Sequence, residues 1–249
     1  VGTEQMSGVA IVNQLMFVYY LCIFGGMSGA GIFTAQYFGQ KDQEGIRNTF
    51  RFKLWTGLIL TVGACLIFLF GGNVLIASFL NGSSDGGDLA AALSYGRGYM
   101  LIMMFGLPAF MMQQVYASTL RECGETVVPM KAGIAAVLVN LVFNYLLIYG
   151  KFGFPQMGVL GAAIATVISR YVEMAIVVCW THSHSSENPY VAGIYGTLKV
   201  PLPLAKQIFV KGLPLLVNEA LWSAGMTMLV QSYSLRGLNV VAGLHIAHT

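Results

Sequence analysis

Three polar side chains that lie deep in apolar segments could do chemistry in this sequence: Asn140, Asn144 and Thr166. Asn140 and Asn144 are four residues apart, so they share one face of a helix. Asn140 and Thr166 each lie eight residues into the apolar segments 132–150 and 158–180, which is about 12 Å at 1.5 Å per residue. The two segments run in opposite directions, so the three side chains can meet near the middle of a bilayer. Their oxygens could bind a small cation; the alternative is interhelical hydrogen bonding, which membrane asparagines commonly provide.

A fourth candidate, Glu219, is the only acidic residue inside the apolar segment 212–235. It lies seven residues beyond Gly212, about 10 Å along a helix. An acid within hydrocarbon is a default candidate for carrying a proton or a cation, and the alternative is a snorkelling or structurally paired glutamate. Arg170 and Glu173 are three residues apart on one helix face, and we expect them to neutralise each other.

The elements that position these residues are predicted to be membrane helices. Of the 249 residues, 56% are hydrophobic and 9% are charged, whereas soluble domains carry about 25% charged residues. The sequence therefore predicts an all-α polytopic membrane protein whose partner is the lipid bilayer. Six apolar segments are long enough to span the bilayer: 6–36, 54–80, 95–120, 132–150, 158–180 and 212–235. A seventh apolar segment begins near Asn239.

Several function classes lack their motifs. The sequence contains no GxSxG, HExxH or Walker motif, so we predict neither an enzyme nor an ATP-driven pump. The sequence contains no stripe of basic residues that would indicate a nucleic-acid partner. The four cysteines are far apart, and His182 and His184 lack further metal ligands nearby. We therefore expect no cofactor and no metal site.

The distribution of Lys and Arg predicts the orientation, because cytoplasmic loops are enriched in them. The loops 41–53, 121–131 and 182–211 hold nine of these residues, and the opposite loops hold three. We therefore expect these three loops to be cytoplasmic in a multi-pass protein of the inner (plasma) membrane.

The long polar connection at 182–211 suggests a boundary between two lobes. We expect residues 1–181 to form five transmembrane helices of an N-terminal lobe and 182–211 to form a cytoplasmic linker with an amphipathic helix. Residues 212–249 would be the first helix and the truncated start of the second helix of a C-terminal lobe. Because Val1 lies almost directly at an apolar segment, we expect the chain to be a fragment.

Several motifs occur in the order found in one transporter family. The first motif is QYFGQKD (36–42), and the second is LRECGET (120–126), which is followed by Pro129 and Met130. The third consists of Asn140 and Asn144 with LI (147–148), then Gly150, Gly153 and Pro155, and it leads into GVLGAAIAT (158–166). The last is GLP (212–214) with Asn218 and Glu219. Together they resemble the multidrug and toxic compound extrusion (MATE) transporters along nearly the whole chain.

This resemblance implies a twelve-helix, two-lobe antiporter, of which the chain covers helices two to seven. Such a protein exports small organic, often cationic, compounds in exchange for Na⁺ or H⁺ by alternating access. Asn140, Asn144 and Thr166 align with members of the family's cation site in the first lobe, and Glu219 aligns with an acid of helix seven. An aspartate of helix one that completes the site lies outside this sequence, and an acid stands at the Asn144 position in some relatives.

Two other functions remain open on the sequence. A related flippase for lipid-linked saccharides would favour a strongly cationic central cavity, whereas Arg170 is the only basic residue deep in a predicted span. A non-transporting membrane scaffold would use the polar residues for helix packing alone.

Overall fold

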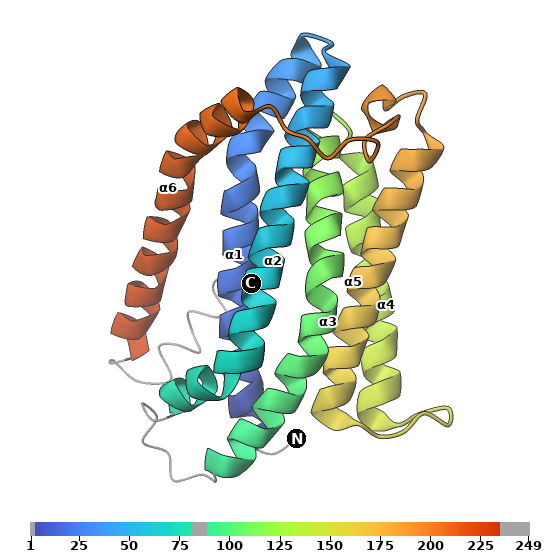
Figure 1. Cartoon of the computed structure of the whole chain (residues 1–249). Coiled ribbons are helices and arrows are strands. Elements are labelled where there is room, and N and C mark those ends of the chain that lie inside the picture. Colours follow the sequence, from blue (N-terminus) through green and yellow to red (C-terminus); the bar gives the residue numbers. More distant parts are fainter. Residues whose placement is uncertain (1–2, 81–88, 235–249) are drawn as a thin grey trace.

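The computed structural model describes residues 3–80 and 89–234, and most of these residues lie in long helices (Figure 1). In chain order the elements are α1 (Thr3–Gly39), α2 (Gln43–Leu80), α3 (Leu89–Glu122), α4 (Val127–Tyr149), α5 (Gly158–Ser183), the 3₁₀ turn η1 (Pro189–Val191) and α6 (Leu202–Ser234). Within the described residues the first five α-helices are long and apolar enough to cross a membrane. The predicted all-α membrane fold is confirmed.

The sixth predicted span falls within α6, and many of its side chains from residue 216 onward lie outside the described set. The predicted start of a seventh span near Asn239 lies outside the described residues altogether. The expected amphipathic linker helix is not a separate element, because its residues form the first turns of α6. That helix continues unbroken through Pro214.

The predicted loop over 41–53 is wrong, because only residues 40–42 separate α1 from α2. The side chain of Asp42 explains the early start of α2: its Oδ1 accepts hydrogen bonds from the backbone N–H groups of Glu44 (3.1 Å) and Gly45 (3.0 Å). Such a cap satisfies donors that the first helical turn leaves free. Arg47, Arg51 and Lys53, which the sequence placed in a loop, therefore lie on a helix.

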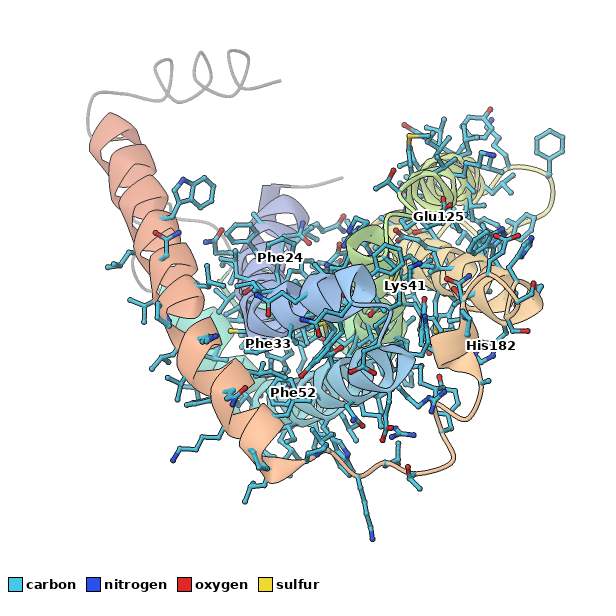
Figure 2. The ribbon with its side chains drawn as sticks, turned by 90° about the horizontal axis from the view of Figure 1, so that it is seen from above. Phe24, Phe33, Lys41, Phe52, Glu125 and His182 are labelled. Atoms are coloured by element: carbon cyan, nitrogen blue, oxygen red, sulfur yellow. The ribbon has the colours of Figure 1, made fainter. Side chains whose placement is uncertain are left out.

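The helix α3 is the centre of the bundle. It packs against α1, α2 and α5, whereas α4 packs on the outer side of α5 and α6 packs on α1 (Figures 1 and 2). In the most apolar stretch of α3, 61% of the residues are buried, whereas 17% are buried in the corresponding stretch of α4. The arrangement places α4 and α6 at opposite sides of the molecule.

The connection from α5 to α6 is bound along α2 by three side chains spaced four residues apart. Arg47 Nε donates to the carbonyl of Tyr190 at 3.2 Å, Arg51 Nε to that of Ile194 at 3.0 Å, and Trp55 Nε1 to that of Leu198 at 2.9 Å. Residues 184–201, which connect α5 to α6, are therefore held against one face of α2, and we call them the strap.

The helices α1 and α6 cross at two glycines. A Cβ atom at Gly29 would lie 2.5 Å from the Cα atom of Gly212, and a Cβ atom at Gly212 would lie 3.0 Å from the Cα atom of Gly29. Small residues allow membrane helices to approach this closely. The crossing fixes where α6 leaves the bundle.

Replacing Gly29 by Ala should loosen this crossing. The added methyl group meets backbone atoms, which cannot turn aside as a side chain can, so α6 must shift. Overpacking of this kind costs about 1–3 kcal/mol, and an SDS titration followed by circular dichroism should show a free energy of unfolding lower by that amount. Gly63→Ala in α2 is the matched control, because no described atom lies within 4 Å of the added methyl group there. Equal losses in the two variants would contradict the role of the crossing.

Candidate functional site

The structure brings Asn140, Asn144 and Thr166 together, as their spacing predicts. Asn144 Nδ2 donates to Asn140 Oδ1 at 2.9 Å, and Asn140 Nδ2 donates to Thr166 Oγ1 at 3.3 Å. Thr166 Oγ1 in turn donates to the carbonyl of Ala162 at 2.9 Å. The three side chains form one hydrogen-bonded chain between α4 and α5, which we call the α4–α5 cluster.

One oxygen of the α4–α5 cluster has no partner. Asn144 Oδ1 is buried and accepts no hydrogen bond from any described group. A buried acceptor without a donor is costly, and such groups in native structures call for an explanation such as a bound ion or water. The cluster thus combines interhelical hydrogen bonding with one oxygen that remains available to a ligand.

The turn between α4 and α5 sets the register of the cluster. α4 ends at Gly150, whose φ of 64° favours glycine, and Met157 N–H donates to the carbonyl of Leu147 at 2.9 Å. One turn further, a Cβ atom at Gly161 would lie 2.8 Å from that same carbonyl oxygen. The absence of a side chain at Gly161 lets α5 lie directly on α4 beside Asn144 and Thr166.

A second polar group lies one helical turn from Thr166. Arg170 Nη1 contacts Glu173 Oε2 at 3.1 Å, which confirms the predicted pair. The other carboxylate oxygen of Glu173 accepts a hydrogen bond from Gln113 Nε2 of α3 at 3.0 Å. The Arg170 guanidinium also lies 5.1 Å from the ring centre of Phe110 and 5.8 Å from that of Tyr20. This positive charge is therefore neutralised by a carboxylate of the same helix.

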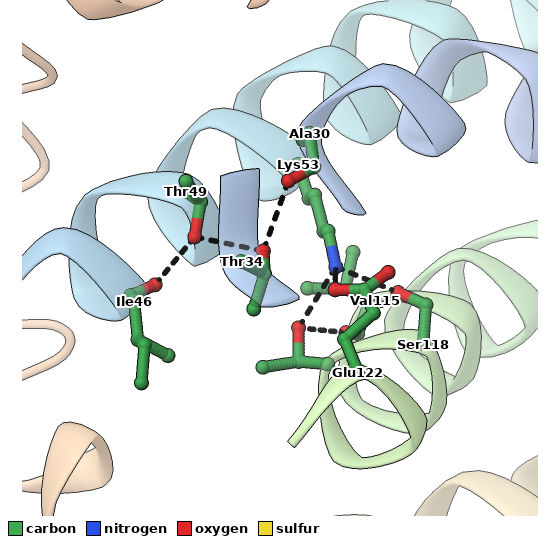
Figure 3. A network of polar contacts seen from close by, with 9 residues as sticks. Ala30, Thr34, Ile46, Thr49, Lys53, Val115, Ser118 and Glu122 are labelled. Carbon is green, nitrogen blue, oxygen red and sulfur yellow. Dashed lines mark hydrogen bonds and ion pairs between the residues drawn. The ribbon is translucent and has the colours of Figure 1, made fainter. Parts of the chain in front are cut away.

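The sequence analysis missed a third polar group, which joins α2 to α3 (Figure 3). Lys53 is fully buried, and its Nζ donates to Ser118 Oγ at 3.1 Å, to Thr119 Oγ1 at 3.2 Å and to the carboxylate of Glu122. The count of loop charges that predicted the orientation treated Lys53 as a loop residue, so this polar group was not predicted. Its apolar neighbours Phe52 and Leu54 were the available signal that a helix runs through this position.

The structure does not bring Glu219 to the α4–α5 cluster. Its helix, α6, packs on α1, whereas α4 packs on α5 at the other side of the molecule (Figure 1). The side chain of Glu219 lies outside the described set, so its role stays a prediction. The two candidate sites are separate within this chain.

Removing the ammonium group of Lys53 should destabilise the bundle strongly. Breaking a buried ion pair leaves an uncompensated charge and costs about 3–5 kcal/mol, so the free energy of unfolding of Lys53→Met should fall by that amount. The double variant Lys53→Met/Glu122→Gln should recover most of the loss, because no buried charge remains. Lys131→Met, at an exposed position of α4, is the matched control and should unfold like the parent chain. A double variant as unstable as the single one would contradict the ion-pair explanation.

Comparisons with known proteins agree with this architecture. The family model MatE matches residues 1–146. "Probable multidrug resistance protein NorM" of Thermotoga maritima is 28% identical over 247 residues, covering 98% of this chain and 50% of the relative. "Probable multidrug resistance protein YoeA" of Bacillus subtilis is 23% identical over 251 residues, covering 99% of this chain and 52% of the relative. The chain spans about half the length of these curated relatives.

Solved structures share the fold. MATE in the bent conformation matches with a TM-score of 0.77 at 23% identity, covering 97% of this chain and 51% of that chain. MATE in complex with MaD3S matches with a TM-score of 0.74 at 25% identity, covering 97% and 52%. Because the family model covers more than half of the sequence, the chain belongs to the MatE family of multidrug and toxic compound extrusion transporters.

Proposed function

We propose that this chain forms part of a secondary active multidrug efflux antiporter, which exports small organic, often cationic, compounds in exchange for Na⁺ or H⁺. The family consists of membrane transporters and not of enzymes, and the relatives are named as multidrug resistance proteins. Because the chain spans half their length, transport by alternating access of two lobes is a proposal about the whole protein. The cell inner (plasma) membrane is its proposed location, with 121–131 and the strap on the cytoplasmic side.

The observation that supports ion coupling most directly is the unpartnered Asn144 Oδ1 in the α4–α5 cluster. A small cation there would contact Asn144 Oδ1 and could draw on Asn140 Oδ1 and Thr166 Oγ1. All three oxygens are neutral, so a further negative charge must come from elsewhere in the protein. We propose that a carboxylate outside the described residues supplies this charge.

The two candidate sites favour different ions. Asparagine and threonine side chains do not take up a proton near neutral pH, so the α4–α5 cluster suits a metal cation such as Na⁺. A carboxylate such as Glu219 can carry either a proton or a cation. A protein in which both contribute could couple export to either gradient.

The flippase alternative receives less support from the described residues. A transporter of anionic lipid-linked saccharides would need a cationic cavity, yet Arg170 is paired with Glu173 and packs over two aromatic rings. A packing scaffold would account for the interhelical hydrogen bonds but not for a buried oxygen left without a donor.

Transport by the whole protein tests this proposal. In proteoliposomes loaded with ethidium, an imposed Na⁺ or H⁺ gradient, applied one at a time, should drive dye movement. We expect Thr166→Val to slow Na⁺-driven movement at least tenfold, because it removes one oxygen without changing side-chain volume, and Glu219→Gln to slow H⁺-driven movement similarly.

Thr197→Val is the matched control for the first variant, because it makes the same change at an exposed residue of the strap. It should transport like the parent protein. If Asn140→Ala and Glu219→Gln together leave movement under both gradients intact, the proposed ion sites are wrong. If the parent protein moves no dye under either gradient, the proposed transport is wrong.

A further inference from the structure

A pocket of about 320 Å³ lies at the end of the bundle where α1, α3 and α5 end and α2 and α4 begin. Its lining includes Phe38, Gln43, Glu125, Trp180, Glu187 and Tyr190, and we call it the helix-end pocket. Glu125 precedes Asn140 by fifteen residues, which is about 22 Å along a helix. The helix-end pocket is therefore a different place from the α4–α5 cluster.

The charged groups in the wall of the helix-end pocket are carboxylates. Glu125 and Glu187 line it, and no Lys or Arg is among the lining residues in the described part of the chain. One oxygen of Glu125 accepts the backbone N–H groups of Val127 (3.0 Å) and Val128 (3.1 Å), which leaves its second oxygen for other partners. This charge favours a cationic ligand and opposes phosphate groups.

Arg47 and His184 are basic residues that contact residues of the lining. Arg47 packs against the strap and donates to the carbonyl of Tyr190 at 3.2 Å. The ring of His184 stacks on that of Trp180 with centres 4.4 Å apart. Neither group supplies a counter-charge within the pocket lining.

Two polar atoms of the wall have no partner. Tyr190 is 3% exposed, and its hydroxyl makes no hydrogen bond with any described group; the same holds for Gln43 Oε1. Burial, with smaller contributions from Cys123 and Glu122, raises the pKa of Tyr190, so its hydroxyl stays neutral. An amide oxygen and a neutral phenol can both accept hydrogen bonds. The unpaired atoms call for a ligand that donates.

Much of the remaining wall is apolar. Phe38 from the end of α1 and Trp180 from the end of α5 contribute aromatic rings, and Pro189 closes the side formed by the strap. Aromatic faces attract organic cations as well as apolar groups. The pocket volume is near the lower limit of the range of about 300–1,000 Å³ that ligand pockets occupy, so the ligand must be small.

We propose that the helix-end pocket binds a small organic ammonium compound. Its cationic head lies between the carboxylates of Glu125 and Glu187, and its N–H groups donate to Tyr190 Oη and Gln43 Oε1. Its apolar part lies against Phe38 and Trp180. This site goes beyond the proposed ion coupling and does not depend on it, because binding here requires no gradient.

Calorimetry on the chain in lipid nanodiscs tests the proposal, with the heat measured on empty nanodiscs subtracted. Benzylammonium is the probe, and benzyl alcohol is its neutral counterpart of nearly equal size. We expect saturable binding of benzylammonium at least tenfold tighter than that of benzyl alcohol. Glu187→Gln should weaken benzylammonium binding about tenfold, and Tyr190→Phe, which keeps the ring, about fivefold.

Glu44→Gln is the matched control, because it removes one exposed carboxylate near the start of α2 outside the pocket lining. Its affinity for benzylammonium should equal that of the parent chain. Equal affinities for the charged and neutral probes would overturn the proposal. So would unchanged benzylammonium binding in both Glu187→Gln and Tyr190→Phe, with thermal unfolding showing that both variants are folded.

Discussion

A polar group inside a membrane-spanning bundle must find its partner within the protein, because hydrocarbon offers none and an unpaired group costs several kcal/mol. In this protein three helix contacts around α3 and α5 contain such a partnership between two helices. Lys53 and Glu122 join α2 to α3, Gln113 and Glu173 join α3 to α5, and Asn140 and Thr166 join α4 to α5. Hydrogen bonding therefore selects which helices are neighbours and at what register.

Close backbone approach makes these partnerships possible. Gly161 lets α5 lie directly on Leu147, which brings Thr166 within reach of Asn140. At Gly31 a Cβ atom would lie 2.5 Å from Glu122 Oε1, so the partly buried carboxylate occupies the space that a side chain would fill. After these pairs form, Asn144 Oδ1 is left without a donor among the described groups, and the proposed cation site rests on this buried acceptor.

The sequence predicted those features that depend on local spacing. Apolar length located the helices, the four-residue spacing of Asn140 and Asn144 with equal depth for Thr166 predicted the α4–α5 cluster, and the spacing of Arg170 and Glu173 predicted their pair. It missed the burial of Lys53, because the partner Glu122 is 69 residues away and charge counting assigns a Lys near a span to a loop. The sequence analysis also divided α6 into a linker helix and a separate span, because Pro214 and the nearby lysines are typical of a helix boundary.

Hydrogen exchange in the whole protein, followed by mass spectrometry of the peptides covering 136–170, tests most directly whether the α4–α5 cluster binds the coupling ion. The measurement is made at constant pH with increasing Na⁺, and then across pH with correction for the intrinsic exchange rate. The account predicts that Na⁺ slows exchange in these peptides, that acid does not, because the cluster holds no group that takes up a proton near neutral pH, and that Thr166→Val abolishes the slowing by Na⁺. Exchange that does not respond to Na⁺, or that responds to Na⁺ equally in Thr166→Val, would contradict it.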